Sequence, residues 1–105
     1  MTKQEYNGWT NYETWCCKLW IDNDERMQEY WEGEAKEYAR MEDDKETAIG
    51  LLADMLQTHY EETSPEVTGF YADILNAALR EVNWHEIASS IIDDLEIDWD
   101  SQSED

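Results

Sequence analysis

The stretch GWTNYETWCCKLWIDNDE, residues 8–25, contains the signals that we expect to start the fold. Thr10 or Asn11 is placed to cap a first helix, because a short polar side chain accepts hydrogen bonds from the free N–H groups of a first turn. The segment DND, residues 22–24, then ends this helix and caps the next one. Several indole rings fall in the same stretch, and rings of this size let a small chain bury a large apolar area. We therefore expect a rigid core to begin here.

Helical periodicity continues through the rest of the chain, and no segment alternates apolar and polar residues as a half-buried strand does. The spacing predicts a second helix at about residues 24–41 and a third at about 45–62, with Asp43 or Asp44 as the cap of the third. In TSPE, Ser64 is placed as a cap and Pro65 as the first residue of a fourth helix. Asn83 in NWHE is placed to cap a fifth helix.

One side of each expected helix is apolar, and we predict that these sides form the core. The predicted core positions are Tyr12, Trp15, Cys16, Leu19, Trp20, Met27, Tyr30, Trp31, Tyr38, Met41, Ala48, Leu51, Leu52, Met55, Leu56, His59, Tyr60, Val67, Phe70, Tyr71, Ile74, Leu75, Ala78, Leu79, Val82, Trp84, Ile87, Ala88, Ile91, Ile92 and Leu95. The tryptophans expected to be substantially buried are Trp15, Trp20, Trp31 and Trp84. Gly33, within the second helix, marks either a weak point or a close helix crossing. Ile97 and Trp99 are expected to fold back on the core.

These patterns predict an all-α fold, a compact single-domain bundle of about five helices with an acidic C-terminal tail. We expect residues 1–100 to form this acidic helical domain and residues 101–105 to be a disordered acidic tail. No segment approaches the ~20 apolar residues that cross a bilayer, and the N-terminus lacks the apolar region of a signal peptide. Adjacent residues on a helix point about 100° apart, so a disulfide between Cys16 and Cys17 is disfavoured. Free thiols suit the cytoplasm, where we expect the protein to lie.

Negative charge is concentrated in the later part of the chain, whose formal net charge is −20 overall. Residues 1–45 hold twelve acidic and six basic side chains, whereas residues 46–105 hold fifteen acidic ones and a single base, Arg80. Because like charges repel and destabilise a compact chain, such a surface points to a partner or an environment that requires it. We predict that the partner-binding acids are Asp54, Glu61, Glu62, Glu66, Asp73, Glu86, Asp93, Asp94, Glu96, Asp98 and Asp100.

Two interpretations of this charge stay open. In the first, the protein imitates nucleic acid. Carboxylates one helical turn apart are about 6 Å apart along the axis, and duplex DNA carries a charge every ~3.4 Å on each strand, so the acids would occlude a cationic groove. In the second, the charge serves solubility, as in salt-adapted proteins, although six tryptophans are unusual in a protein of that kind.

Other chemistries find little support in the sequence. DNDE begins at Asp22 like a calcium-binding loop, but the sixth position is Met27 rather than Gly. His85 and Glu86 begin like the zinc motif H-E-x-x-H, but Ser89 stands where the second His is required. The four glycines form no phosphate-binding loop. No Ser or Cys has a general base at a sequence spacing typical of a nucleophilic active site. We therefore predict that the protein is not an enzyme and has no metal and no cofactor.

The opening stretch resembles that of a family of small acidic proteins from phages, plasmids and their bacterial hosts. The shared pattern is N-Y-E-T-W, then a short apolar run, then L-W-[IL]-D-N-D, met here by residues 11–15 and 19–24. ADILNAALREVNWHEIASSII, residues 72–92, is similar to the second block of that family, whereas CCK, residues 16–18, departs from the expected run. The resemblance implies a small helical protein of mobile genetic elements, without an assigned function and without catalytic residues.

Mobile elements also encode acidic inhibitors of host defence, among them antirestriction proteins, anti-CRISPR proteins and inhibitors of uracil glycosylase. Setting and charge together favour an inhibitor that binds and blocks a cationic nucleic-acid-binding host protein, without touching nucleic acid or membrane itself. The alternative is a non-inhibitory acidic interaction or regulatory module. The aromatic and capping residues of the shared pattern would then specify the scaffold that carries the acids.

The isolated protein should not bind DNA or RNA. Affinity for phosphates comes from Lys and Arg, which release counterions, and the chain holds seven of these against 27 acids. A gel-shift assay with the purified protein at physiological salt should therefore show no retarded nucleic acid. A retarded band would contradict both interpretations of the charge.

Overall fold

The computed structural model of the chain describes residues 5–42, 44–97 and 99, and these residues form an all-α single domain. Its helices, in chain order, are α1 (Tyr12–Asn23), α2 (Glu25–Met41), α3 (Lys45–Glu62), α4 (Phe70–Glu81) and α5 (Trp84–Asp94). The described part contains no strand, only an isolated bridge between Tyr6 and Trp9. The predicted fold class is therefore confirmed.

Polar side chains cap four of the helices, as the sequence predicts. Asn11 accepts a hydrogen bond from the Thr14 N–H at the start of α1, and Asp24 accepts from the N–H groups of two residues at the start of α2. Asp44 and Asn83 cap α3 and α5 in the same way. Each cap satisfies an N–H group that the helix itself leaves free, so these helix starts are set by local chemistry.

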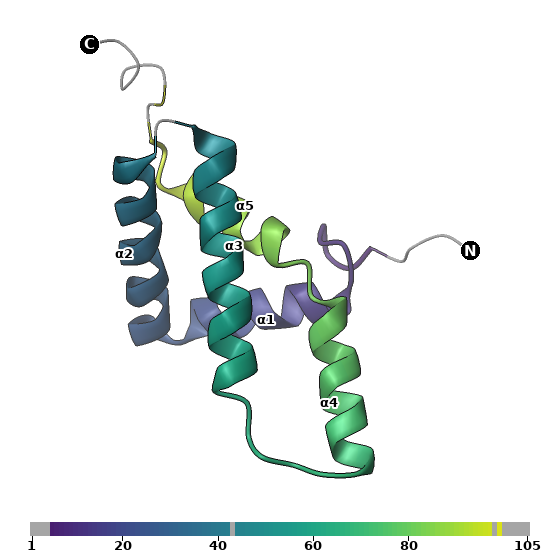
Figure 1. Cartoon of the computed structure of the whole chain (residues 1–105). Coiled ribbons are helices and arrows are strands. Elements are labelled where there is room, and N and C mark those ends of the chain that lie inside the picture. Colours follow the sequence, from purple (N-terminus) through teal and green to yellow (C-terminus); the bar gives the residue numbers. More distant parts are fainter. Residues whose placement is uncertain (1–4, 43, 98, 100–105) are drawn as a thin grey trace.

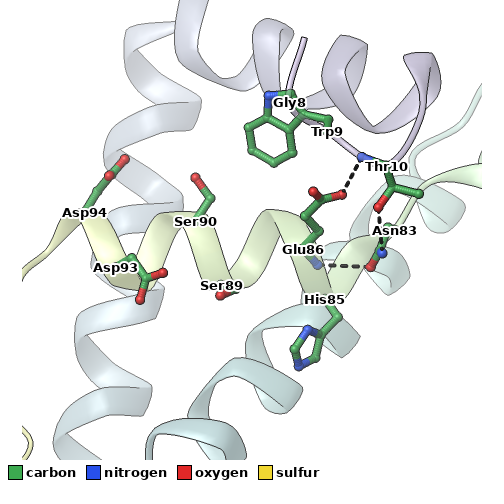
Figure 2. A pocket seen from close by; sticks show the side chains of 10 residues that line it. All are labelled: Gly8, Trp9, Thr10, Asn83, His85, Glu86, Ser89, Ser90, Asp93 and Asp94. Carbon is green, nitrogen blue, oxygen red and sulfur yellow. Dashed lines mark hydrogen bonds between the residues drawn. The ribbon is translucent and has the colours of Figure 1, made fainter. Parts of the chain in front are cut away.

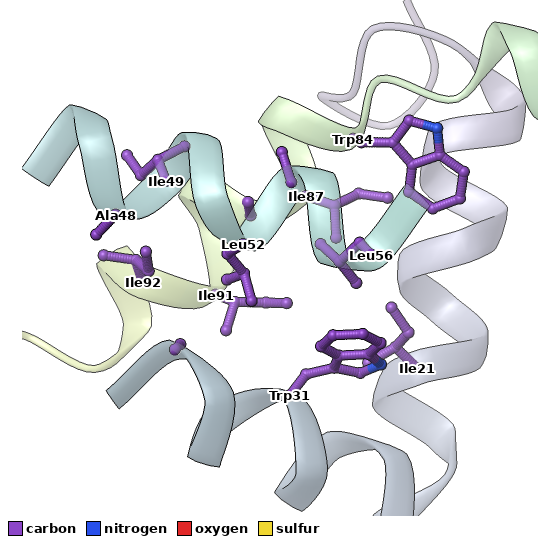
Figure 3. Close-up of a cluster of buried hydrophobic side chains, with 13 residues drawn as sticks. Ile21, Trp31, Ala48, Ile49, Leu52, Leu56, Trp84, Ile87, Ile91 and Ile92 are labelled. Atoms are coloured by element: carbon purple, nitrogen blue, oxygen red, sulfur yellow. The ribbon is translucent and has the colours of Figure 1, made fainter. Parts of the chain in front are cut away.

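Helices α2, α3 and α5 form the centre of the domain, with α3 packed against both of the others. Helix α1 lies across one end of this group, and α4 packs mainly against α1 (Figure 1). The core between the helices contains Trp31 from α2, Leu52 and Leu56 from α3, and Ile87 and Ile92 from α5 (Figure 3). Trp31 is 0% exposed, and burying one such ring removes a large apolar area from water.

Helix α1 turns a different face to the core from the one predicted. Its buried residues are Thr14, Lys18 and Ile21, whereas Trp20 is 72% exposed and Leu19 is exposed as well. The Lys18 side chain keeps its apolar stem inside, and its Nζ pairs with Asp22 at 2.8 Å. The remaining predicted core residues of α1 are only partly covered or, in the case of Tyr12, exposed.

Helix α2 also buries smaller residues than the pattern indicates. Ala35 and Ala39 lie in the interior beside Trp31, whereas Met41 is 60% exposed. Gly33 is exposed, and a Cβ placed on it would meet nothing within 4 Å, so it marks no close helix crossing. Because a methyl group takes up little room between helices, alanine suits these buried positions where α2 packs against α3 and α5.

The start of α4 differs most from the prediction. The helix begins at Phe70, after Gly69 with φ of 65°, and not at Pro65. The Ser64 hydroxyl donates a hydrogen bond to the carbonyl oxygen of Glu61 at 3.1 Å, so it completes the end of α3 instead of capping the next helix. A left-handed φ is readily adopted by glycine, which makes Gly69 the residue where the chain turns into α4.

Beyond α5, the chain folds back as predicted at one position. Trp99 is partly buried and packs against the core cluster, together with Leu95 at the end of α5. Ile97 between them is also partly buried.

A buried hydroxyl joins the starts of α1 and α5. Thr14 is 0% exposed, and its Oγ1 donates to Asn11 Oδ1 at 2.6 Å while it accepts from the Asn83 N–H at 2.9 Å. Asn11 Nδ2 donates in turn to the carbonyl oxygen of Glu81, at the end of α4, at 2.7 Å. The two caps are thereby linked through the Thr14 hydroxyl, which fixes how α1 meets the α4–α5 connection.

Replacing Thr14 by Val should destabilise the fold by roughly 1–3 kcal/mol, because the variant keeps the shape but leaves the Asn83 N–H facing a methyl group. Thr47→Val is the matched control. The Thr47 hydroxyl bonds the Asp44 cap at 2.8 Å in the same local pattern, but it is exposed and makes no contact with a distant helix. Urea unfolding should show a clearly larger loss for Thr14→Val than for Thr47→Val, and equal losses would contradict the proposed link.

Candidate functional site

The predicted binding acids lie in two separate groups. Glu61, Glu62, Glu66 and Asp73 surround the connection between α3 and α4, and we name these four the loop-end acids (Figure 1). Asp93, Asp94 and Glu96 lie at the end of α5, near the start of α3. Since α3 has 18 residues, the two groups lie roughly 25 Å apart along its axis. Asp54 is exposed in the middle of α3. Asp98 and Asp100 fall outside the described residues.

The loop-end acids are all exposed, and none of them forms an ion pair within the described part of the chain. The polar contact of Glu61 is with a neutral group, because Gln57 Nε2 donates to its Oε2 at 3.0 Å. The base on α4, Arg80, comes seven residues after Asp73, which is about 10 Å along the helix. The described part of the chain therefore leaves the charge of these carboxylates uncompensated by an ion pair.

The acids near the end of α5 are partly neutralised. Asp93 accepts a 2.7 Å ion pair from Lys45, although the sequence places no base near it. Both side chains are about half exposed, and a surface pair of this kind contributes little, typically ~0–1 kcal/mol. Asp94 and Glu96 are exposed and have no ion pair with a described residue. Charge alone is thus less available here than at the loop-end acids.

Glu86 differs from the other predicted acids, because it is partly buried and holds the chain together. Its Oε1 accepts a hydrogen bond from the Thr10 N–H at 3.1 Å, and its own N–H donates to the Asn83 cap at 3.0 Å (Figure 2). A carboxylate engaged in this way fixes the segment before α1 to α5. We therefore assign Glu86 a positioning role in the fold.

An open hollow of about 630 Å³ lies along this part of α5. Its lining residues are Gly8, Trp9, Thr10, Asn83, His85, Glu86, Ser89, Ser90, Asp93 and Asp94 (Figure 2). His85 Nε2 faces Glu46 Oε1 on α3 at 3.5 Å and makes no hydrogen bond to the serines. Among residues 5–42, 44–97 and 99, no cluster of His, Cys, Asp and Glu has the arrangement of a metal site.

A second hollow, of about 320 Å³, lies between α1 and α4 and is mostly apolar. The sequence pattern predicts a packed core here. The residues that line the hollow are Tyr12, Glu13, Cys16, Cys17, Tyr60, Ala78, Leu79, Val82 and Trp84. Both cysteines are free thiols, as predicted. Burial, with a smaller contribution from neighbouring Cys16, raises the pKa of Cys17 to about 12.

The first half of α4 presents an apolar surface that sequence reasoning assigned to the core. Phe70 is 70% exposed, Tyr71 71% and Ile74 54%, and α4 has no buried residue at all. Only the far end of the stripe is covered, where Leu79 and Val82 pack against the core. A stripe at helical spacing shows that a helix has an apolar side, but not whether the fold covers that side.

Comparison with known proteins gives one match. A family model described as Family of unknown function (DUF7249) matches residues 2–102 of the chain. No curated protein and no solved structure matches this chain. In the part of the chain that the structure describes, every helix is too short or too polar to cross a membrane.

The raised pKa of Cys17 should appear in the pH dependence of stability. In the unfolded chain the thiol ionises near pH ~8.5, whereas in the folded protein its pKa is about 12. The folded state therefore retains the proton longer, so the stabilisation is complete below about pH 8.5 and is lost as pH rises toward the folded pKa. Between about pH 8 and about pH 10, Cys17→Ala should lose less stability in urea unfolding than the unmodified protein. The control Cys16→Ala removes only the smaller cause of the raised Cys17 pKa, so it should retain most of the pH dependence. A pH dependence in Cys17→Ala identical to that of the unmodified protein would contradict the assignment.

Proposed function

The chain belongs to this family of unknown function, and we propose that it is an acidic inhibitor that binds and blocks a cationic nucleic-acid-binding protein. The acids take the place of nucleic-acid phosphates on the target, so inhibition is by competitive occlusion. The resemblance of the opening stretch to proteins of phages and plasmids supports a target in host defence, as in antirestriction or anti-CRISPR action, and action in the host cytoplasm.

The observation that carries this proposal is the unpaired charge of the loop-end acids. Four exposed carboxylates stand around one connection, and the described residues provide no ion pair for any of them. Repulsion among them lowers the stability of the free protein, and a basic partner would relieve it. Opposite charges also steer a partner toward the surface and speed association, in a way that salt weakens.

The helical scaffold supports the comparison with nucleic acid. Asp54 and Glu61 are seven residues apart on α3, hence about 10 Å along its axis, or roughly three phosphate steps of one DNA strand. Glu66 and Asp73 continue the series across the loop onto α4, a separate rigid element. Carboxylates mounted on one helix keep a defined spacing along its axis, as phosphates do along a strand.

A second function is favoured by the separation of the acids into two groups. Charge at both ends of α3, rather than on one continuous face, is what solubility alone requires. In that case the protein is a non-inhibitory interaction or regulatory module, and its acids take no part in recognition.

Neutralising the loop-end acids should weaken capture of the target. The test variant combines Glu61→Gln, Glu62→Gln, Glu66→Gln and Asp73→Asn. The control removes the same charge from α2 by Glu25→Gln, Glu29→Gln, Glu32→Gln and Glu34→Gln. Immobilised protein should retain basic nucleic-acid-binding proteins from an extract of the host at low salt, and added duplex DNA should displace them. The loop-end variant should retain about tenfold less, with a flatter salt dependence, while the α2 variant changes retention far less.

Each other outcome has a definite meaning. Retention that DNA does not displace contradicts competitive occlusion. Equal loss in both variants indicates diffuse attraction to the whole acidic surface. Undiminished retention in both variants leaves solubility as the role of the charge.

A further inference from the structure

The apolar half of α4 requires an occupant, and the surrounding charge indicates which one. We propose that Phe70, Tyr71 and Ile74 dock the apolar side of a basic amphipathic helix or loop of the target. The face formed by these three residues is called the α4 anchor face. This inference rests on the proposed inhibitor function and adds to it the element of the partner that the protein recognises.

The α4 anchor face is an exposed side of an ordered helix. Phe70 and Ile74 are one turn apart, and Tyr71 continues the same stripe toward Leu75 and Ala78. The first turn of α4 lies at the end away from α1, where Figure 1 shows the helix extending past the rest of the domain. Three large side chains at these exposures present roughly 300–400 Å² of surface, the size of a patch that is often functional.

The chain itself does not supply a cover for this face. The residues outside the described part, 1–4, 43, 98 and 100–105, contain one apolar side chain, Met1, and several acids. Residues of that composition are poorly suited to cover the apolar face. Packing them on it would bury almost no apolar side chain of their own and would remove charged groups from water.

A second copy of the chain is a poor occupant on two grounds. Stable interfaces bury about 800 Å² on each partner, so the anchor face supplies less than half of what a dimer needs. The remaining area would have to come from the surroundings of α4, which are acidic, and each copy carries a net charge of −20. Repulsion between like surfaces therefore opposes self-association.

A basic partner would instead be attracted by the acidic residues around the α4 anchor face. Asp73 is three residues after Phe70 and so lies beside it on the helix, and Glu66 precedes the helix by one turn's length of chain. Glu62 ends α3 on the other side of the loop. Lys or Arg residues that flank an apolar stripe would meet these carboxylates while the stripe packs on Phe70 and Ile74. This arrangement, an apolar centre with a charged rim, is the usual anatomy of a protein interface.

Two synthetic helical peptides of equal positive charge test the inference. One carries Leu at helical spacing between its Lys residues, and the other carries Ala in place of every Leu, which keeps the helix but removes most of the apolar side. The native protein should bind the Leu peptide at least about tenfold more tightly, as expected when a few buried side chains dominate binding. In the variant Phe70→Ser with Ile74→Ser, this preference should fall to within about twofold, whereas affinity for the Ala peptide stays the same.

Trp20→Ser is the matched control, because Trp20 is as exposed as Phe70 but belongs to another helix. It lies in the C-terminal half of α1, whereas the start of α1 is the end linked to α4. It should leave the preference intact. Circular dichroism and urea unfolding should show that the variants fold, because the replaced side chains are exposed. Amide chemical shifts of the native protein on titration with the Leu peptide should move most in α4.

Three results would overturn the inference. Equal affinity for both peptides, unchanged in the α4 variant, shows that charge alone binds the partner and leaves the proposed function standing. Failure of both peptides to bind at low salt contradicts the acidic capture on which the proposed function depends. A native dimer in sedimentation that Phe70→Ser with Ile74→Ser dissociates shows that a second copy occupies the face.

Discussion

The Thr14 hydroxyl is the contact on which the arrangement of the outer helices depends. It donates to the cap of α1 and accepts from the cap residue of α5, so one buried oxygen serves two helix starts. Because Thr14 must face inward to do this, the opposite side of α1, with Trp20, faces water. The same link fixes the end of α4 through Asn11, while the beginning of α4 is left without a partner. The exposed anchor face thus lies on the half of α4 that this hydrogen-bond network does not reach.

A core of large side chains allows the surface to remain anionic. Unpaired carboxylates cost stability, and the pairs Arg40–Glu37 and Lys45–Asp93 remove little of that cost, since they lie at the surface. Trp31 and the isoleucines and leucines of α3 and α5 provide the opposing term, because each fully buried side chain of this kind contributes roughly 1.5–3 kcal/mol. The indole rings near the start of the chain serve the scaffold only in part. Trp9 packs against the core, whereas Trp15 sits in a half-exposed cluster with Tyr6.

Those features that depend on neighbours in sequence could be predicted. The bounds of α3 and the caps at Asp44 and Asn83 follow from local chemistry, and the periodicity of α5 matches its buried face. The start of α4 could not be predicted, because periodicity does not decide whether the Ser64 hydroxyl bonds forward to a helix or back to Glu61. The buried face of α1 depends on a residue 69 positions away. For the site, exposure of the acids could be predicted from their places off the stripes, whereas the pairing of Asp93 with Lys45 required the tertiary fold.

Charge and apolar surface would act at different stages of binding, which explains why one small protein keeps both exposed. Long-range attraction by the loop-end acids raises the rate of encounter but also attracts many basic proteins, and salt screens it. Apolar packing on Phe70 and Ile74 acts only at contact, is insensitive to screening, and slows dissociation. A free protein with carboxylates alone would bind every cationic groove weakly, and one with the anchor face alone would tend to aggregate. Under the proposed function, acids and apolar face at one end of the domain would act together: the acids would keep the face soluble, and the face would select among the partners that the acids attract.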